Sequence, residues 1–203
     1  FVLAAALESG AFKSHSTVDT SPGSFKVGSK LITDKHNLGN ISLATVLTKS
    51  SNVGISKIAM ELEPRFMWNT FSQFGFGALT GSGLPAESAG LLANYNSWRP
   101  ISQATMSYGY GMSVTLLQLA EAYATLGNRG QHLPISMLRL VDPSSSESVI
   151  SEETSRSLIE MMETVVAEGG TGVGDCAPGA VVACDPRGAA LERRTGINKY
   201  WPS

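Results

Sequence analysis

The chain has 203 residues, enough for one sizeable domain or two small lobes with a buried core. Hydrophobic residues make up 42 % of the sequence and charged residues 16 %, which excludes a disordered tail and a coiled coil. The formal net charge is −2, from 15 Lys+Arg and 17 Asp+Glu, so no basic surplus is present to bind a phosphate backbone. Nucleic acid is therefore not expected as a partner.

The ends of the sequence indicate an internal fragment. The longest strongly apolar run, Phe1 to Leu7, is too short to span a bilayer. It also lacks the charged start and the cleavage site of a signal peptide. The chain opens in the middle of a helical pattern and stops at Trp201-Pro202-Ser203 without a closing element.

Metal and cofactor chemistry are not indicated by the sequence. The two cysteines, Cys176 and Cys184, form neither a CxxC site nor a disulfide framework. The three histidines, His15, His36 and His132, lack HxxxH or HExxH spacing, so we expect surface or helix-capping roles for them. No metal site and no organic cofactor are expected.

The first half of the chain predicts helices and one hairpin. A helical run over Phe1–Leu7 ends near Gly10, and the turn-rich residues 17–38 favour a hairpin or loop with Phe25, Val27 and Leu31 alternating. Three helical segments follow. Their apolar faces are formed by Leu43, Val46 and Leu47; by Val53, Ile58, Ala59 and Leu62 before Pro64; and by Phe66, Phe71 and Phe74.

The second half begins with glycine-rich turns. Residues 75–85 fail the Rossmann spacing by one position, and no P-loop lysine is present, so turn chemistry is the interpretation. Thr115 is placed to cap a helix that ends near residue 127. The face of that helix is predicted to contain Leu116, Leu119, Ala120 and Tyr123.

Two further elements are expected toward the carboxyl end. Ile135–Val141 predicts a strand, and Ser151 is placed to cap a last helix that ends at Gly169-Gly170. The inward residues of that helix are Leu158, Met161, Met162 and Val165. Met60, Met67, Met161 and Met162 are interpreted as core filling, and the acidic Asp34 and Glu121 as surface residues of a turn and a helix.

The composition changes abruptly at Val173. The 22 residues from Val173 to Arg194 contain both cysteines, five alanines and three arginines, but no Ser, Thr, Asn, Lys, Ile, Phe, Tyr or Met. That mixture is typical of an out-of-frame reading of GC-rich DNA; the alternative is a flexible loop.

Several separate motifs resemble one enzyme family. They are the opening run Phe1–Gly10, Thr48-Lys49-Ser50-Ser51-Asn52-Val53-Gly54, Ser107-Tyr108-Gly109-Tyr110-Gly111, Gln118–Ala124 and Gly169-Gly170-Thr171-Gly172. Together they resemble the transpeptidase domain of class B penicillin-binding proteins, most of all the division-specific, FtsI-type peptidoglycan D,D-transpeptidase. The chain is accordingly treated as one partial transpeptidase domain over 1–203, family-like over 1–172, anomalous over 173–196 and family-like again over 197–203.

The resemblance implies a fold and a mechanism. The fold would be α+β, the one shared with serine β-lactamases, and this chain would hold mainly the helical lobe. The family uses Ser-x-x-Lys, Ser-x-Asn and Lys-Thr/Ser-Gly motifs. The second falls on Ser50 and Asn52: Ser50 would relay a proton toward the leaving group, and Asn52 would orient the substrate amide. Tyr108 and Tyr110 would contact substrate in the cleft, although tyrosines between glycines also fit packing and a turn.

The other two motifs are not evident in the sequence. No lysine has a serine three places before it, so the nucleophile motif is expected upstream of Phe1, and this chain alone is expected to be inactive. The nearest substitute for Lys-Thr-Gly is Arg194-Thr195-Gly196, which makes Thr195 and Gly196 candidate substrate-binding residues. It falls late in the family pattern, and loss of the motif inside residues 173–196 is the other interpretation.

The implied function is the cross-linking of cell-wall stem peptides through an acyl-serine during septum formation. β-Lactams would acylate the same serine. The partners of the full-length protein would be peptidoglycan, β-lactams and membrane proteins of the division complex. Its place would be the periplasmic face of the bacterial inner membrane, held by an N-terminal anchor. Two alternatives stay open: a non-catalytic scaffold of the same fold, and a serine β-lactamase or penicillin sensor.

Overall fold

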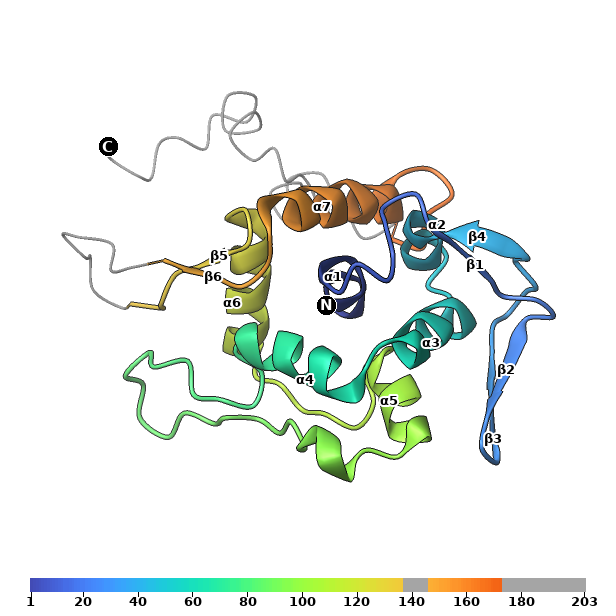
Figure 1. Cartoon of the computed structure of the whole chain (residues 1–203). Coiled ribbons are helices and arrows are strands. Elements are labelled where there is room, and N and C mark those ends of the chain that lie inside the picture. Colours follow the sequence, from blue (N-terminus) through green and yellow to red (C-terminus); the bar gives the residue numbers. More distant parts are fainter. Residues whose placement is uncertain (137–145, 173–203) are drawn as a thin grey trace.

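The computed structural model describes residues 1–136 and 146–172, which form a ring of helices around a central one (Figure 1). The described helices are α1 Val2–Glu8, α2 Leu43–Thr48, α3 Asn52–Glu61, α4 Pro64–Gln73, the 3₁₀ turn η1 Tyr95–Ser97, α5 Pro100–Met106, α6 Leu116–Gly127 and α7 Glu152–Val166. The strands are β1 Thr17–Asp19, β2 Ser24–Val27, β3 Lys30–Thr33, β4 Asn40–Ser42, β5 Gln131–His132 and β6 Glu147–Ser148.

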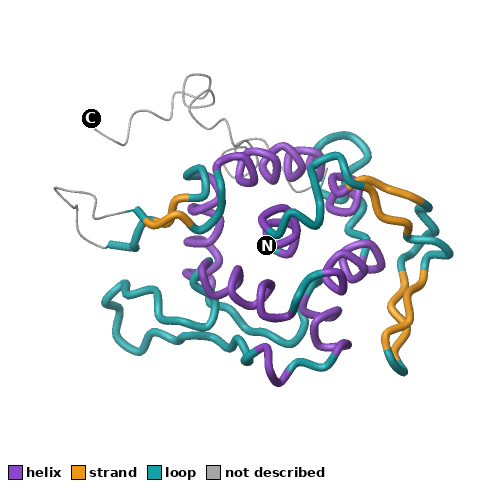
Figure 2. The backbone as a smooth tube through the Cα atoms, in the orientation of Figure 1, coloured by secondary structure: helices purple, strands orange, loops and turns teal. Residues whose placement is uncertain are grey.

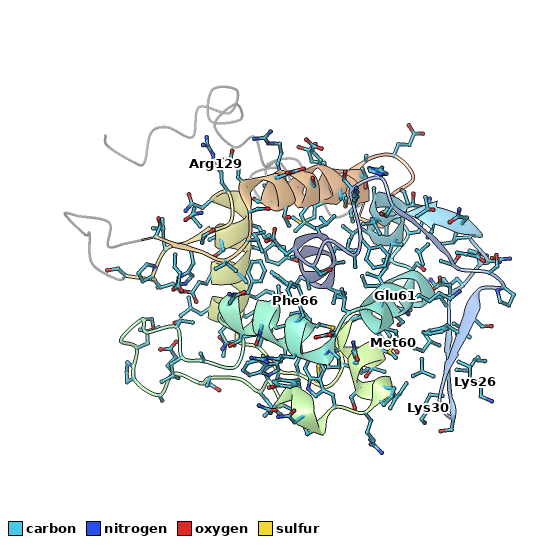
Figure 3. All side chains as sticks on the ribbon, in the orientation of Figure 1. Lys26, Lys30, Met60, Glu61, Phe66 and Arg129 are labelled. Atoms are coloured by element: carbon cyan, nitrogen blue, oxygen red, sulfur yellow. The ribbon has the colours of Figure 1, made fainter. Side chains whose placement is uncertain are left out.

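The central helix is α1, and its sequence explains its position. Five consecutive residues of α1, from Val2 to Ala6, are buried, so the helix is surrounded on all sides. Three of them are alanines, which let neighbouring backbones approach closely. The helix contacts α3, α4 and α7, and Figure 2 shows the helices of the ring closing around it. Phe66, predicted to point inward, packs against this core from α4 (Figure 3).

The strands form three small antiparallel pairs at the edges of the ring. β1 pairs with β4, β2 with β3, and β5 with β6. The predicted hairpin is confirmed as β2–β3, which turns at Gly28-Ser29 and places Phe25 opposite Ile32. Leu31 lies on the opposite face from Phe25 and Val27, so the alternation predicted from these three residues does not continue through the turn. Leu31 pairs with Lys26 on the other face and is 63 % exposed, because the period of two puts Val27 and Ile32 on the buried side.

Most helix predictions in the first half are confirmed. α2, α3 and α4 occupy the predicted segments, and the core includes Leu43, Val46, Ile58, Ala59, Leu62, Met67, Phe71 and Phe74. The helix after Ser151 is confirmed as α7. It buries Leu158 and Met161, and the Ser151 side chain accepts a hydrogen bond from the Thr154 backbone N–H. α7 ends at Val166, before the glycines that were predicted to terminate it.

The predicted face of α6 was wrong. Thr115 caps the helix as expected, but Leu116 is 87 % exposed and Tyr123 is 48 % exposed. Gln118 accounts for the rotation. Its buried amide Nε2 donates to the carbonyls of Gly75, Ala78 and Ala89, and this polar contact turns a different face inward. The buried residues of α6 are Gln118, Glu121, Ala122, Thr125 and Leu126.

The remaining predictions concern loops. The glycine-rich stretch forms turns, and Gly75, Gly77, Gly81 and Gly83 all have positive φ. The strand predicted at Ile135–Val141 lies mostly outside the described residues, and residues 135–136 are not in a strand. Residues 173–203, including both cysteines, also lie outside them. None of the helices in the described ranges has the length and apolar character needed to cross a membrane.

Candidate active site

The junction between α2 and α3 places Ser50 in a backbone conformation that few residues adopt. The N–H of Ser50 donates to the Leu47 carbonyl and that of Ser51 to the Val46 carbonyl, both at 3.0 Å. This pattern is a Schellman motif that ends α2, and Ser50 lies at its left-handed position with φ +52°. Glycine is the usual residue there, because a Cβ costs about 1–2 kcal/mol in that region. Ser50 is held in this conformation by its surroundings.

The next residue, Ser51, begins α3. Its buried hydroxyl accepts a hydrogen bond from the Gly54 backbone N–H at 2.8 Å, as an N-cap does. The same hydroxyl donates to Asp34 Oδ2 at 2.5 Å, and Asp34 Oδ1 accepts from the Val53 N–H at 3.0 Å. One carboxylate from the end of the β2–β3 hairpin therefore binds both the cap and the first turn of α3. Its negative charge is favourable at a helix N-terminus.

Ser50 and Asn52 both face a pocket of about 570 Å³. Within the described ranges, neither the Ser50 hydroxyl nor the Asn52 amide forms a hydrogen bond with another protein group. The polar groups of both are thus available to a molecule in the pocket. Its lining residues are Thr33, Asp34, Lys35, His36, Leu38, Lys49, Ser50, Asn52, Gly169 and Thr171.

The segment after α7 also lines this pocket, through Gly169 and Thr171. Lys49 Nζ donates to the Gly169 carbonyl at 2.7 Å, and the Thr171 N–H donates to the Thr48 carbonyl at 3.1 Å. The hydroxyls of Thr48 and Thr164 are hydrogen-bonded to each other at 2.5 Å. Residues far apart in the sequence therefore hold the Ser50–Asn52 loop from both sides.

Comparison with known proteins shows the family of this chain. Residues 1–184 match the family model described as the penicillin binding protein transpeptidase domain. The chain belongs to that family. Its fold is similar to the transpeptidase domain of penicillin-binding protein 3 from Burkholderia pseudomallei, with a TM-score of 0.84 and 37 % identity over 88 % of this chain and 55 % of that one.

Curated proteins with similar sequences are named as peptidoglycan D,D-transpeptidases. The peptidoglycan D,D-transpeptidase FtsI of Escherichia coli K12 is 37 % identical over 98 % of this chain and 34 % of its own length. The probable peptidoglycan D,D-transpeptidase PenA of Neisseria meningitidis serogroup B is 37 % identical over 88 % of this chain and 30 % of its own length. The chain thus spans about a third of the length of these relatives.

Of the two candidate tyrosines, Tyr108 packs in a cluster with Val53 of α3, and Tyr110 contacts Tyr108. Tyr108 packs against the buried Val27, Ile32, Val53 and Ala104, and its ring meets that of Tyr110 edge-on at 5.7 Å. Burial, and next the neighbouring Tyr110, raise the pKa of Tyr108. Tyr110 is 67 % exposed. Neither ring is among the described residues that line the 570 Å³ pocket, so substrate contact by these tyrosines stays a prediction. Thr195 and Gly196 lie outside the described residues.

Two acidic residues were misplaced by the sequence interpretation. Glu121 was expected on a helix surface but is only 6 % exposed, and its Oε1 lies 2.8 Å from Nε2 of His132, which is partly buried as well. The rotation of α6 around Gln118 explains the burial of Glu121. Asp34 was expected on a turn surface but is partly buried at the pocket wall. The described residues contain no cluster of three or more His, Cys, Asp or Glu that could hold a metal.

Sequence reasoning missed Asp34, Lys49 and Gly169 as parts of the site. Lys49 precedes the Ser-x-Asn motif directly, so its proximity was readable, but its bond to the Gly169 carbonyl required the fold. Asp34 carried only one signal, its place at the end of the predicted hairpin.

Proposed function

We propose that this chain supplies the Ser-x-Asn part of the active site of a peptidoglycan D,D-transpeptidase. The observation that carries the proposal is that the Ser50 hydroxyl and the Asn52 amide line one pocket, each without a hydrogen-bond partner among the described residues. Family membership supports the reaction class, because the curated relatives are named as D,D-transpeptidases.

The chemistry is acyl transfer. A serine of the family's Ser-x-x-Lys motif, which the 203 residues do not contain, attacks the carbonyl of the D-Ala-D-Ala bond. Ser50 Oγ then passes a proton toward the departing amine, because a hydroxyl can accept one hydrogen bond while donating another. The Asn52 amide donates to the substrate carbonyl and fixes the scissile bond. β-Lactams, whose strained amide takes the place of that bond, acylate the same serine.

The proposal extends to the setting of the full-length protein. The substrate is the stem peptide of peptidoglycan, and the product is a cross-link made during septum formation. The protein acts on the periplasmic face of the inner membrane, held by an N-terminal segment, with membrane proteins of the division complex as partners. This setting is supported by the likeness to FtsI of Escherichia coli.

Labelled penicillin tests the function. The full-length protein is expected to form a stable covalent adduct on serine that unlabelled penicillin blocks. Failure to form any adduct would favour a non-catalytic scaffold of the same fold. Rapid release of the label as hydrolysed penicillin would instead favour a β-lactamase or penicillin sensor.

The segment 173–196 has its own test. We propose that it is an out-of-frame reading, since its composition departs from that of the rest of the chain. Resequencing the coding DNA should give a Lys-Thr-Gly or Lys-Ser-Gly motif in another frame. If the protein sequence stands as written, Thr195 and Gly196 remain the candidates for that motif.

A further inference from the structure

Asp34 connects the β2–β3 hairpin to the loop that carries Ser50 and Asn52. It follows Thr33, the last residue of β3, and its two carboxylate oxygens bind the Ser51 hydroxyl and the Val53 N–H. We propose that Asp34 is a positioning residue for the Ser-x-Asn motif, acting through Ser51. This inference rests on the proposed transpeptidase function.

Contacts from distant residues add to the two local backbone bonds that hold Ser50 at the end of α2. Ser50 has φ +52°, a region that disfavours residues with a Cβ, and its hydroxyl has no partner within the described part of the protein. The two residues that flank Ser50 also bind distant parts of the chain: Lys49 binds Gly169, and Ser51 binds Asp34. If Ser51 moves, Ser50 turns with it, since they share a peptide plane.

The position of Asp34 is itself fixed by the hairpin. Its N–H donates to the Gly23 carbonyl at 3.0 Å, so the residue is tied to the strand opposite its own. The inner face of the hairpin, with Val27 and Ile32, packs in one cluster with Val53 of α3. Lys26 and Leu31 pair on the outer face, whereas Lys30 pairs with Val27 next to the turn (Figure 3). The Asp34 carboxylate is thus positioned by the β2–β3 hairpin, which packs against α3, the helix whose first turn the carboxylate binds.

The two hydrogen bonds of Asp34 predict what each substitution at this residue removes. Asp34→Ala removes both acceptors. Asp34→Asn keeps one acceptor for either Ser51 or Val53 and presents an NH₂ group to the other, so it retains part of the support. A displacement of about 1 Å in a reacting group lowers a rate by up to about a hundredfold. The expected order of acylation rates is therefore wild type, Asp34→Asn and, slowest, Asp34→Ala.

Glu8→Gln is a matched control. The Glu8 carboxylate accepts the hydroxyl of another N-cap serine, Ser151 of α7, so the substitution removes the same kind of bond from a helix start. Ser151 lies at the opposite end of α7 from the Gly169 segment that touches the site. This variant should lower stability without changing acylation of the folded protein.

The experiment measures labelled-penicillin acylation of the full-length protein at saturating antibiotic, together with the Tm of each variant. We expect Asp34→Ala to slow acylation by about tenfold to a hundredfold per folded molecule. Asp34→Asn should show a smaller loss and Glu8→Gln none. Because Asp34 acts through Ser51, adding Asp34→Ala to a Ser51→Ala protein should cost much less than it does alone.

The results distinguish a positioning role of Asp34 from a purely structural one. If Asp34 variants lose Tm as Glu8→Gln does and acylate at the wild-type rate, Asp34 is only structural and the inference is overturned. If Asp34→Ala does not fold, the Asp34→Asn rate decides by the same rule. A wild-type protein that forms no adduct at all would overturn the proposed function, and the inference with it. A wild-type adduct with unaffected variants overturns the inference alone.

Discussion

Two helices of this protein begin with the same chemical device. At the start of α3, Ser51 caps the helix and donates its hydroxyl to Asp34 of the hairpin. At the start of α7, Ser151 caps the helix and donates its hydroxyl to Glu8 at 2.7 Å, while its N–H donates to the same carboxylate at 3.1 Å. In both places a carboxylate from a distant element completes the N-cap.

The residue before each cap makes the difference. Ile150 precedes Ser151 and is 2 % exposed, so the device at α7 is backed by the hydrophobic core. Ser50 precedes Ser51 and is exposed, in a left-handed conformation, and its hydroxyl has no hydrogen-bond partner among residues 1–136 and 146–172. The contacts at α7 thus serve stability. Those at α3 also support the loop in which we propose that Ser50 acts.

The largest effect is expected at Ser50, where two substitutions distinguish the contribution of the hydroxyl from that of the backbone conformation. Both Ser50→Ala and Ser50→Gly remove the hydroxyl that we propose relays a proton, so each should slow acylation of the full-length protein by at least about a hundredfold. Ser50→Gly should be more stable than Ser50→Ala by about 1 kcal/mol, because only glycine is relaxed at φ +52°. Labelled-penicillin kinetics and urea unfolding measure the two effects. Undiminished acylation in both variants would remove Ser50 from the mechanism, and equal stabilities would show that its backbone is not strained.

Substitutions at two glycines test the packing around the Ser51 cap without replacing a polar side chain. A Cβ at Gly54 would lie 2.9 Å from Ser51 Oγ and 2.9 Å from Val46 Cγ2, whereas one at Gly127 would meet nothing within 4 Å. Gly54→Ala should therefore cost about 1–3 kcal/mol of unfolding free energy. It should also slow acylation by displacing Ser51. Gly127→Ala, at the end of α6, should be neutral or stabilising by up to about 1 kcal/mol. Urea midpoints of the two variants test this, and a Gly54→Ala protein as stable as wild type would contradict the close packing.

The sequence predicted those parts of the fold that depend on local patterns. The stripes of α2, α3 and α4, the β2–β3 hairpin and the Ser151 cap are all set by neighbours within a few residues. The outward face of α6 could not be read, because Gln118 is drawn inward by three carbonyls 29 to 43 residues earlier in the chain. Apolar periodicity takes no account of a buried amide.

The candidate site divides in the same way. Ser50 and Asn52 were recognisable because a motif of three consecutive residues carries them. Asp34 lies 17 residues before Ser51 and Gly169 lies 120 residues after Lys49, so neither contact leaves a trace in local spacing. The contacts that support the Ser50–Asn52 loop depend on tertiary packing, whereas the side chains that the loop exposes are given by its own sequence.

The smallest expected effect is the pH dependence of the stability that the Glu8–Ser151 contact at the start of α7 contributes. Burial acts to raise the pKa of Glu8, but the hydrogen bonds from Thr154 and Ser151 together outweigh it and lower the pKa from its ordinary value of 4.5. A carboxylate with a lowered pKa in the folded state stabilises the protein fully above that ordinary value, and this contribution is lost as the pH falls through the lowered pKa. Glu8→Gln should therefore reduce Tm slightly at pH 7, since Glu8 is exposed and screened by solvent, and the difference from wild type should vanish in acid. Melting curves of both proteins from neutral to acidic pH measure this. A difference that stays constant below the ordinary pKa would contradict a stabilising contribution from the Glu8 charge.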